Sequence, residues 1–130
     1  SSYKIAKAIV EYRKKEEIST TKELADLVSS VVKRRNKIHP ATRVFMALRI
    51  YVNNELDNLS NALRQAVYLL KSGGRLCVIS YHSLEDRIVK RFFKESGCRI
   101  IGKSVITPTR EEISVNRRAR SAKLRGLEKL

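Results

Sequence analysis

Apolar residues in the first third of the chain recur at the spacing of an α-helix. Ile5, Ala8, Ile9 and Tyr12 fall at i, i+3, i+4 and i+7, so a helix with one apolar face is predicted there. A second helix is predicted after Thr20, because Thr20 and Glu23 have the spacing of a capping box. The apolar face of this second helix holds Leu24, Leu27, Val28 and Val31.

A third helix is predicted to begin at Pro40, because proline suits the first helical turn, where its missing N–H has no partner. Its predicted buried side holds Val44, Leu48, Tyr51 and Val52, and its other side Thr42, Met46, Arg49 and Asn53. We expect a break near Asp57. The helical pattern then resumes over 59–70 and ends at Gly73 and Gly74, where a glycine can adopt the left-handed conformation.

The second half of the chain mixes strands with helices. Residues 75–81 are predicted to form a strand buried on both faces, with Cys77 in the core, because four consecutive apolar residues follow Arg75. A helix capped by Ser83 to Asp86 follows and stops at Gly97. We further predict a strand over 99–107, a polar loop over 109–120 and a short last strand near 122–127. Three strands make a poor isolated sheet, so neighbouring strands are expected.

A polar cluster follows the first predicted strand. Ligands of open α/β sheets bind just beyond the carboxyl ends of the strands, so this cluster is the first candidate site. Its members are Tyr81, His82, Ser83, Glu85, Asp86 and Arg87.

The charge balance is strongly basic. The chain has 28 Lys and Arg against 13 Asp and Glu, a formal net charge of +15, which favours a polyanionic partner, most often nucleic acid. A merely solubilising surface is the alternative interpretation. The cations gather in two clusters and on one helix face, at Lys33, Arg34, Arg35 and Lys37, at Arg117, Arg118, Arg120, Lys123 and Arg125, and at Arg87, Lys90, Arg91 and Lys94.

Several other classes are disfavoured. No apolar run approaches the roughly 18 residues of a membrane span, and the two cysteines cannot build a disulfide framework or a zinc site by themselves. His82 has no second ligand at metal spacing, so no metal site is predicted. A cytoplasmic location fits best. The chain begins at Ser1 without a methionine, and we expect it to be part of a longer protein.

Four segments resemble one known family, in the right order and over essentially the whole chain. They are His39–Arg43 (HPATR), Ala47–Ile50 (ALRI), Ser80–Arg87 (SYHSLEDR) and Arg118–Arg125 (RARSAKLR). The family is the bacterial small-subunit (16S) ribosomal RNA (cytosine-N4)-methyltransferase family of the MraW type.

The resemblance implies an α/β fold, the C-terminal part of a class I Rossmann-like methyltransferase sheet plus part of an inserted all-helical domain. Residues 1–56 look like part of the insert and 57–130 like the C-terminal part of the methyltransferase domain. The family uses S-adenosylmethionine, but its donor-binding half precedes the matched region. We therefore assign no catalytic and no cofactor-binding residue here, and expect this chain alone to be inactive. Met46, Tyr81 and Arg117 stand where the family commonly has Gln, Phe and Pro.

Ten residues are candidates for contacts with RNA or substrate, namely His82, Ser83, Asp86, Arg87, Arg43, Arg49, Asn53, Arg118, Arg120 and Lys123. Each has a structural alternative. His82 could bond the local backbone, Ser83 could cap a helix, and Asp86 could lie in a first helical turn that favours carboxylates. Arg43, Arg49 and Asn53 could clamp RNA or support the catalytic domain.

The implied partner is 16S ribosomal RNA in the small ribosomal subunit, with no membrane and a possible homodimer. Two alternatives to an enzyme are open. The chain could be a non-catalytic RNA-binding module of the same fold, or its helical part could mainly mediate dimerisation.

Overall fold

The computed structural model describes residues 2–32 and 38–130, without the side chains of residues 103–104. The chain divides into two compact units, Ser1–Asn53 and Asn54–Leu130. We predicted a boundary between residues 56 and 57, and the structure divides the chain between Asn53 and Asn54. The assignment of the units to an inserted domain and a methyltransferase domain stays a prediction. The basic cluster at 33–37 lies outside the described residues.

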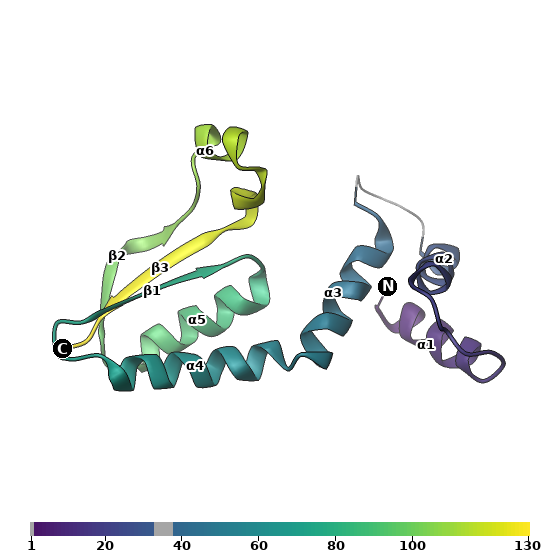
Figure 1. Ribbon diagram of the computed structural model, residues 1–130, viewed down its shortest axis with the longest axis horizontal. Coiled ribbons are helices and arrows are strands. Elements are labelled where there is room, and N and C mark those ends of the chain that lie inside the picture. The colour runs from purple at the N-terminus through teal and green to yellow at the C-terminus, as the bar shows by residue number, and fades with distance from the viewer. Residues whose placement is uncertain (1, 33–37) are drawn as a thin grey trace. The chain divides into compact units, whose positions relative to one another are not determined.

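The first unit contains three helices, α1 (Ser2–Arg13), α2 (Thr21–Val31) and α3 (Pro40–Val52) (Figure 1). The predicted capping box of α2 is present: Thr20 accepts from the Glu23 N–H, and the Glu23 side chain accepts from the Thr20 N–H. His39 caps α3, because its Nδ1 accepts from the Ala41 N–H at 3.2 Å. Leu24, Val28 and Ala41 form a buried cluster, and Ile50 of α3 is buried as well.

The predicted buried side of α3 is wrong over its second half. Leu48, Tyr51 and Val52 are exposed, Tyr51 to 85%. In this unit α3 packs against α2 through the side that carries Ala41, Val44 and Phe45. One neighbouring helix covers only a narrow stripe, so the apolar residues outside that stripe remain at the surface.

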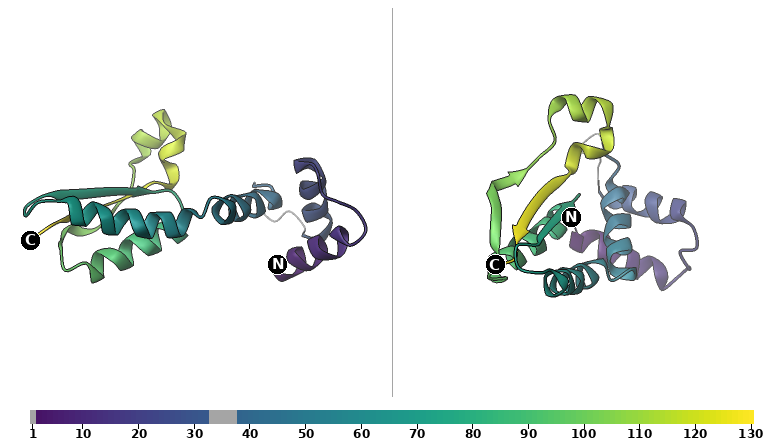
Figure 2. Two further views of the ribbon diagram at one scale, coloured as in Figure 1. Left: turned by 60° about the horizontal axis from the view of Figure 1, so that its bottom comes forward. Right: turned by 60° about the vertical axis from the view of Figure 1, so that its left-hand side comes forward.

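The second unit places two helices on one side of a three-stranded antiparallel sheet (Figures 1 and 2). The strand order is β1–β3–β2, and β3 pairs with both neighbours. The mixed α/β class is confirmed. In chain order the elements are α4 (Glu55–Leu69), β1 (Arg75–Ser80), α5 (Ser83–Glu95), β2 (Arg99–Ile106), α6 (Arg110–Val115), a 3₁₀ helix (Arg117–Ser121) and β3 (Lys123–Glu128).

Two local predictions need correction. The helical pattern breaks at Asn54, which has a left-handed backbone with φ 51°, and α4 then begins at Glu55, before Asp57. The segment 109–120 is helical over most of its length. Thr109 caps α6 by accepting from the Glu112 N–H at 3.2 Å, so a short polar sequence without an apolar face still forms a helical turn. Within the described ranges, every helix is too short or too polar to cross a membrane.

The core of the second unit lies between the sheet and α4 and α5. Its fully buried residues are Leu63, Val89, Phe93 and Leu127, with Leu76 and Val78 of β1 packed against them. The prediction that β1 is buried on both faces is wrong, because exposure alternates along it and Cys77 and Ile79 are exposed. The described elements cover only one face of the sheet, so the other stays open.

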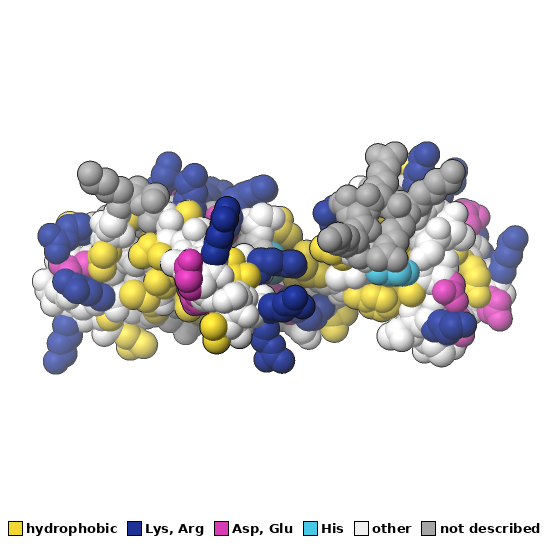
Figure 3. All heavy atoms as spheres, turned by 90° about the horizontal axis from the view of Figure 1, so that it is seen from above, with side chains coloured by type: hydrophobic (Ala, Val, Ile, Leu, Met, Phe, Trp, Pro, Cys, Tyr) yellow, Lys and Arg dark blue, Asp and Glu magenta, His cyan; other side chains and the backbone are white. Residues whose placement is uncertain are grey.

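Strand β1 is an edge strand, since β3 is its only strand neighbour in the described part of the chain. Its outer backbone groups therefore have no ladder partner there. Yellow apolar atoms remain visible among the dark-blue cations of the surface (Figure 3). A bare edge and an open apolar face both suit a sheet that continues into further strands.

Candidate functional site

The candidate site begins where β1 ends and α5 starts. His82 is the N-cap of α5, and its Nδ1 accepts from the Glu85 N–H at 3.3 Å. In return, Oε2 of Glu85 accepts from the N–H groups of Tyr81 (2.9 Å) and His82 (3.3 Å). The predicted cap at Ser83 is therefore displaced by one residue. His82 has the extended backbone that a cap requires, whereas Ser83 is already helical and exposed.

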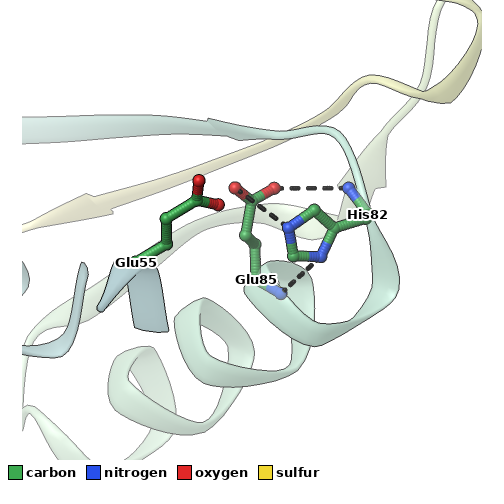
Figure 4. A group of neighbouring side chains, drawn as sticks. All are labelled: Glu55, His82 and Glu85. Carbon is green, nitrogen blue, oxygen red and sulfur yellow. Dashed lines mark hydrogen bonds and ion pairs between the residues drawn. The ribbon is translucent and has the colours of Figure 1, made fainter. Parts of the chain in front are cut away.

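A glutamate that the sequence did not indicate completes this cluster. Glu55, the first residue of α4, points toward His82 and Glu85 (Figure 4). One ligand atom from each of the three side chains lies within 4.8 Å of the others. Glu55 is far from His82 in sequence, and only the packing of α4 against α5 brings them together. No local pattern could have revealed this pairing.

The hydrogen bonds indicate where His82 carries its proton. Nδ1 accepts from the backbone, so the neutral ring carries its hydrogen on Nε2. Nε2 is buried without a well-formed hydrogen bond to any described residue, and Oε1 of Glu85 lies 3.3 Å away. The cluster therefore presents an imidazole nitrogen to two carboxylates in a partly buried setting.

A second cluster joins α5 to β3 through Asp86. Arg125 donates from Nε to Oδ1 at 2.8 Å and from Nη2 to Oδ2 at 3.3 Å, and Lys123 donates from Nζ to Oδ2 at 3.2 Å. Asp86 is 8% exposed. The hydrogen bonds from Arg125, and after them the one from Lys123, lower the pKa of the Asp86 carboxyl against the opposing effect of burial. The structure thus joins two predicted site residues, Asp86 and Lys123.

The remaining predicted cations lie at the surface. Arg87 is exposed on α5, and Arg118 and Arg120 are exposed on the 3₁₀ helix that leads into β3. In the first unit, Arg43 and Arg49 are exposed on α3, and the predicted site residue Asn53, the C-cap of α3, is exposed as well. The basic face of α5 is also exposed as its spacing predicted. Contact of any of these residues with RNA stays a prediction.

A shallow cavity of about 280 Å³ adjoins the basic face of α5. Its cations are Lys90, Lys94 and Arg125, and its apolar part is formed by Phe93 and Ile100 together with Ile101 and Gly126.

The second unit is a basic α/β unit with a polar cluster at a strand end and, among its described strands, two edge strands, β1 and β2. Comparison with known families defines it further: residues 1–130 match the MraW methylase family, and the chain belongs to that family. The resemblance inferred from the four motifs is thereby confirmed.

Curated relatives in three bacteria are all named ribosomal RNA small subunit methyltransferase H. The chain is 59% identical over 131 residues to the protein of Coprothermobacter proteolyticus, covering 97% of the chain and 44% of that protein. It is 51% identical over 136 residues to that of Wolbachia pipientis wMel, covering 99% and 43%. It is 50% identical over 147 residues to that of Caldicellulosiruptor saccharolyticus, covering 98% and 48%. The chain thus spans less than half the length of these relatives.

Proposed function

We propose that this chain supplies the C-terminal part of an S-adenosylmethionine-dependent methyltransferase that methylates N4 of a cytidine in small-subunit ribosomal RNA. The observation that carries the proposal is the family match over residues 1–130, together with relatives at 50–59% identity that bear a ribosomal RNA methyltransferase name. The finer assignment, to N4 of cytidine and to this methyl donor, rests on the resemblance described above.

The architecture of the second unit supports this proposal. Strand β1 has a bare outer edge, and one face of the sheet exposes Cys77 and Ile79. Both features fit a sheet that is completed by strands and helices of a longer protein. The chain has less than half the length of its relatives, so more than half of their length is available to complete it.

The charged residues of this chain indicate which part of the reaction it would serve. S-adenosylmethionine would supply an electrophilic methyl group, which the exocyclic amine of cytosine attacks. The residues here would hold the RNA. Arg87, Arg118 and Arg120 are exposed and available to phosphates. Asp86 is buried between Arg125 and Lys123, so we assign it the positioning of those cations and not a contact with RNA.

Donor binding gives the first test. Isothermal titration of S-adenosylmethionine is performed with this chain and with one extended to the full length of the curated relatives. We expect binding only to the extended chain, because the resemblance places the donor-binding residues before the matched region. An extended chain that neither binds the donor nor methylates small-subunit RNA would refute the enzymatic proposal and favour an RNA-binding module.

RNA binding gives the second test. Filter binding of a small-subunit ribosomal RNA fragment should weaken steeply as salt increases, because cation–phosphate contacts release counterions. Replacing Arg118 and Arg120 with Gln should make the plot of the logarithm of the RNA-binding constant against the logarithm of the salt concentration less steep, by about 1 for each lost phosphate contact. The matched control replaces Arg75 and Arg99 with Gln. It removes the same charge from arginines that Glu128 already pairs. Equal effects of the two double variants would exclude a specific role for the 3₁₀ helix.

A further inference from the structure

One buried nitrogen at the end of β1 has a charged neighbour but lacks the hydrogen bond that buried polar atoms normally have. Nε2 of His82 is inaccessible to solvent, and its contact with Oε1 of Glu85 at 3.3 Å is an ion pair only when the ring is protonated. Buried polar groups are nearly always satisfied, and an exception calls for a specific explanation such as a ligand or an ion. The side chains nearest to this nitrogen are acidic, since Glu55 and Glu85 each bring a carboxylate oxygen into the same group (Figure 4).

We propose that Glu55, His82 and Glu85 form a binding site for one divalent transition-metal ion of the Zn²⁺ type. An imidazole nitrogen and two carboxylates are ligands that Zn²⁺ accepts, at bond lengths of about 2.0–2.2 Å. Two ligand atoms at the corners of such a tetrahedron are about 3.3–3.6 Å apart. Nε2 of His82 and Oε1 of Glu85 are 3.3 Å apart, and all three ligand atoms lie within 4.8 Å of one another. Small side-chain adjustments would bring Glu55 to the required distance.

The ligands come from two elements that pack together. Glu55 belongs to the first turn of α4, and His82 and Glu85 belong to the first turn and cap of α5. The contacts between α4 and α5, which share the buried residues Leu63 and Val89, fix their separation. An ion bound here would therefore link the starts of the two helices. This inference is independent of the proposed methyltransferase function.

Metal binding would change the hydrogen bonds of the cap in a defined way. Nε2 must lose its proton to become a ligand, so the proton moves to Nδ1, which then cannot accept from the Glu85 N–H. Oε2 of Glu85 keeps its bonds to the Tyr81 and His82 N–H groups, which leaves Oε1 as the ligand oxygen. One helix-cap hydrogen bond is thus exchanged for a metal bond, and this exchange can be observed.

The test is a Co²⁺ titration of the tag-free 130-residue chain, followed by visible absorption and by displacement with Zn²⁺. We expect one equivalent of Co²⁺ with the d–d bands of a tetrahedral or five-coordinate site. Glu55→Gln and His82→Asn should each weaken binding by at least about 10-fold. Asparagine is itself a good N-cap, so His82→Asn removes the ligand and keeps the cap.

Two matched variants control for charge and for cap chemistry. Asp57→Asn removes an exposed carboxylate from the same first turn of α4, and His39→Asn replaces the histidine that caps α3 through Nδ1 in the same manner. Both should bind Co²⁺ as the unmodified chain does. Far-ultraviolet circular dichroism of every variant verifies that it is folded.

Three results would overturn the proposal. They are no Co²⁺ binding by the unmodified chain, binding that Glu55→Gln leaves unchanged, and intense near-ultraviolet thiolate bands that place the ion on Cys77 or Cys98. Nitrogen-15 spectra of the imidazole give a second readout that does not depend on a variant. Addition of Zn²⁺ should move the His82 proton from Nε2 to Nδ1 and shift the Glu85 amide signal. A ring that keeps its proton on Nε2 at saturating Zn²⁺ would show that the cluster is only a helix cap.

Discussion

Replacing Asp86 with Asn tests whether the pairing of α5 with β3 depends on one carboxylate. Asp86 accepts two hydrogen bonds from Arg125 and one from Lys123, at 2.8–3.3 Å. Asparagine preserves the shape and can still accept the shortest bond through Oδ1. Its amide group, however, would present hydrogens where Oδ2 accepts from the Arg125 Nη2 and the Lys123 Nζ.

The size of the effect follows from these lost bonds and from solvent exposure. A hydrogen bond to a charged group contributes about 1.5–3 kcal/mol, which applies to Arg125 because its side chain is only 18% exposed. The bond from Lys123 contributes about 0.2–1 kcal/mol, because the Lys123 side chain is 38% exposed and screened by water. Asp86→Asn should therefore lower the free energy of unfolding of the second unit by about 2–4 kcal/mol.

The assay is urea unfolding followed by far-ultraviolet circular dichroism, with a separate transition fitted for each unit. Arg125→Met should lower the free energy of unfolding more than Lys123→Met does, because the Arg125 side chain is the more buried of the two. Asp57→Asn removes an exposed carboxylate of α4 and should change stability by no more than about 0.5 kcal/mol. An Asp86→Asn variant as stable as Asp57→Asn, or a larger loss for Lys123→Met than for Arg125→Met, would refute this account.

Three further predictions concern the second unit. The pKa of the Asp86 carboxyl is lowered chiefly by its hydrogen bonds with Arg125. The ionised carboxylate therefore contributes its full stabilisation of the folded unit above the ordinary carboxyl pKa of about 3.9, and this contribution is lost as the pH falls through the lower, folded-state pKa. Acid titrations of stability should therefore fall more steeply below about pH 4 for the unmodified chain than for Asp86→Asn, and parallel curves would exclude this role. Lys129→Met should lower the free energy of unfolding, measured with urea, by about 1–2 kcal/mol. The reason is that Lys129 Nζ donates to three backbone carbonyls at the end of α4 at 2.7–3.2 Å. Lys71→Met, at an exposed lysine, is the control, and an equal effect of the two variants would contradict the prediction. Gly74→Ala should lower the free energy of unfolding by about 1–3 kcal/mol, because a Cβ there would lie 2.8 Å from the Lys71 carbonyl oxygen. The loss should appear as a lower urea midpoint. An unchanged midpoint would show that this turn adjusts without cost.

Local sequence was enough to predict most helix and strand positions. The capping box of Thr20 and Glu23, the start of α3 at Pro40 and the stop of α5 before Gly97 all depend on residues within a few positions of one another. The motifs were also enough to identify the family. At Asn54 and at the His82 cap, the error was a shift of a few residues in an element that does exist, whereas the short helices within 109–120 were predicted as a loop.

Burial was predicted less well than secondary structure. The continuous apolar run in β1 suggested two covered faces, yet Cys77 and Ile79 are exposed, and the apolar end of α3 exposes Tyr51 and Val52. An apolar pattern shows which residues gain by burial. Whether they are buried depends on the elements that pack against them.

The sequence by itself therefore determined the elements, the basic character and the family, because hydrogen bonds within a turn and recurring motifs act over short stretches of chain. Only the tertiary structure decided which side chains form the two clusters at the end of β1. Glu55 approaches His82 because α4 packs against α5, and Asp86 meets Arg125, 39 residues further along the chain, because β3 lies beside β1. Such contacts depend on how separate elements pack, and no spacing along the chain records that packing.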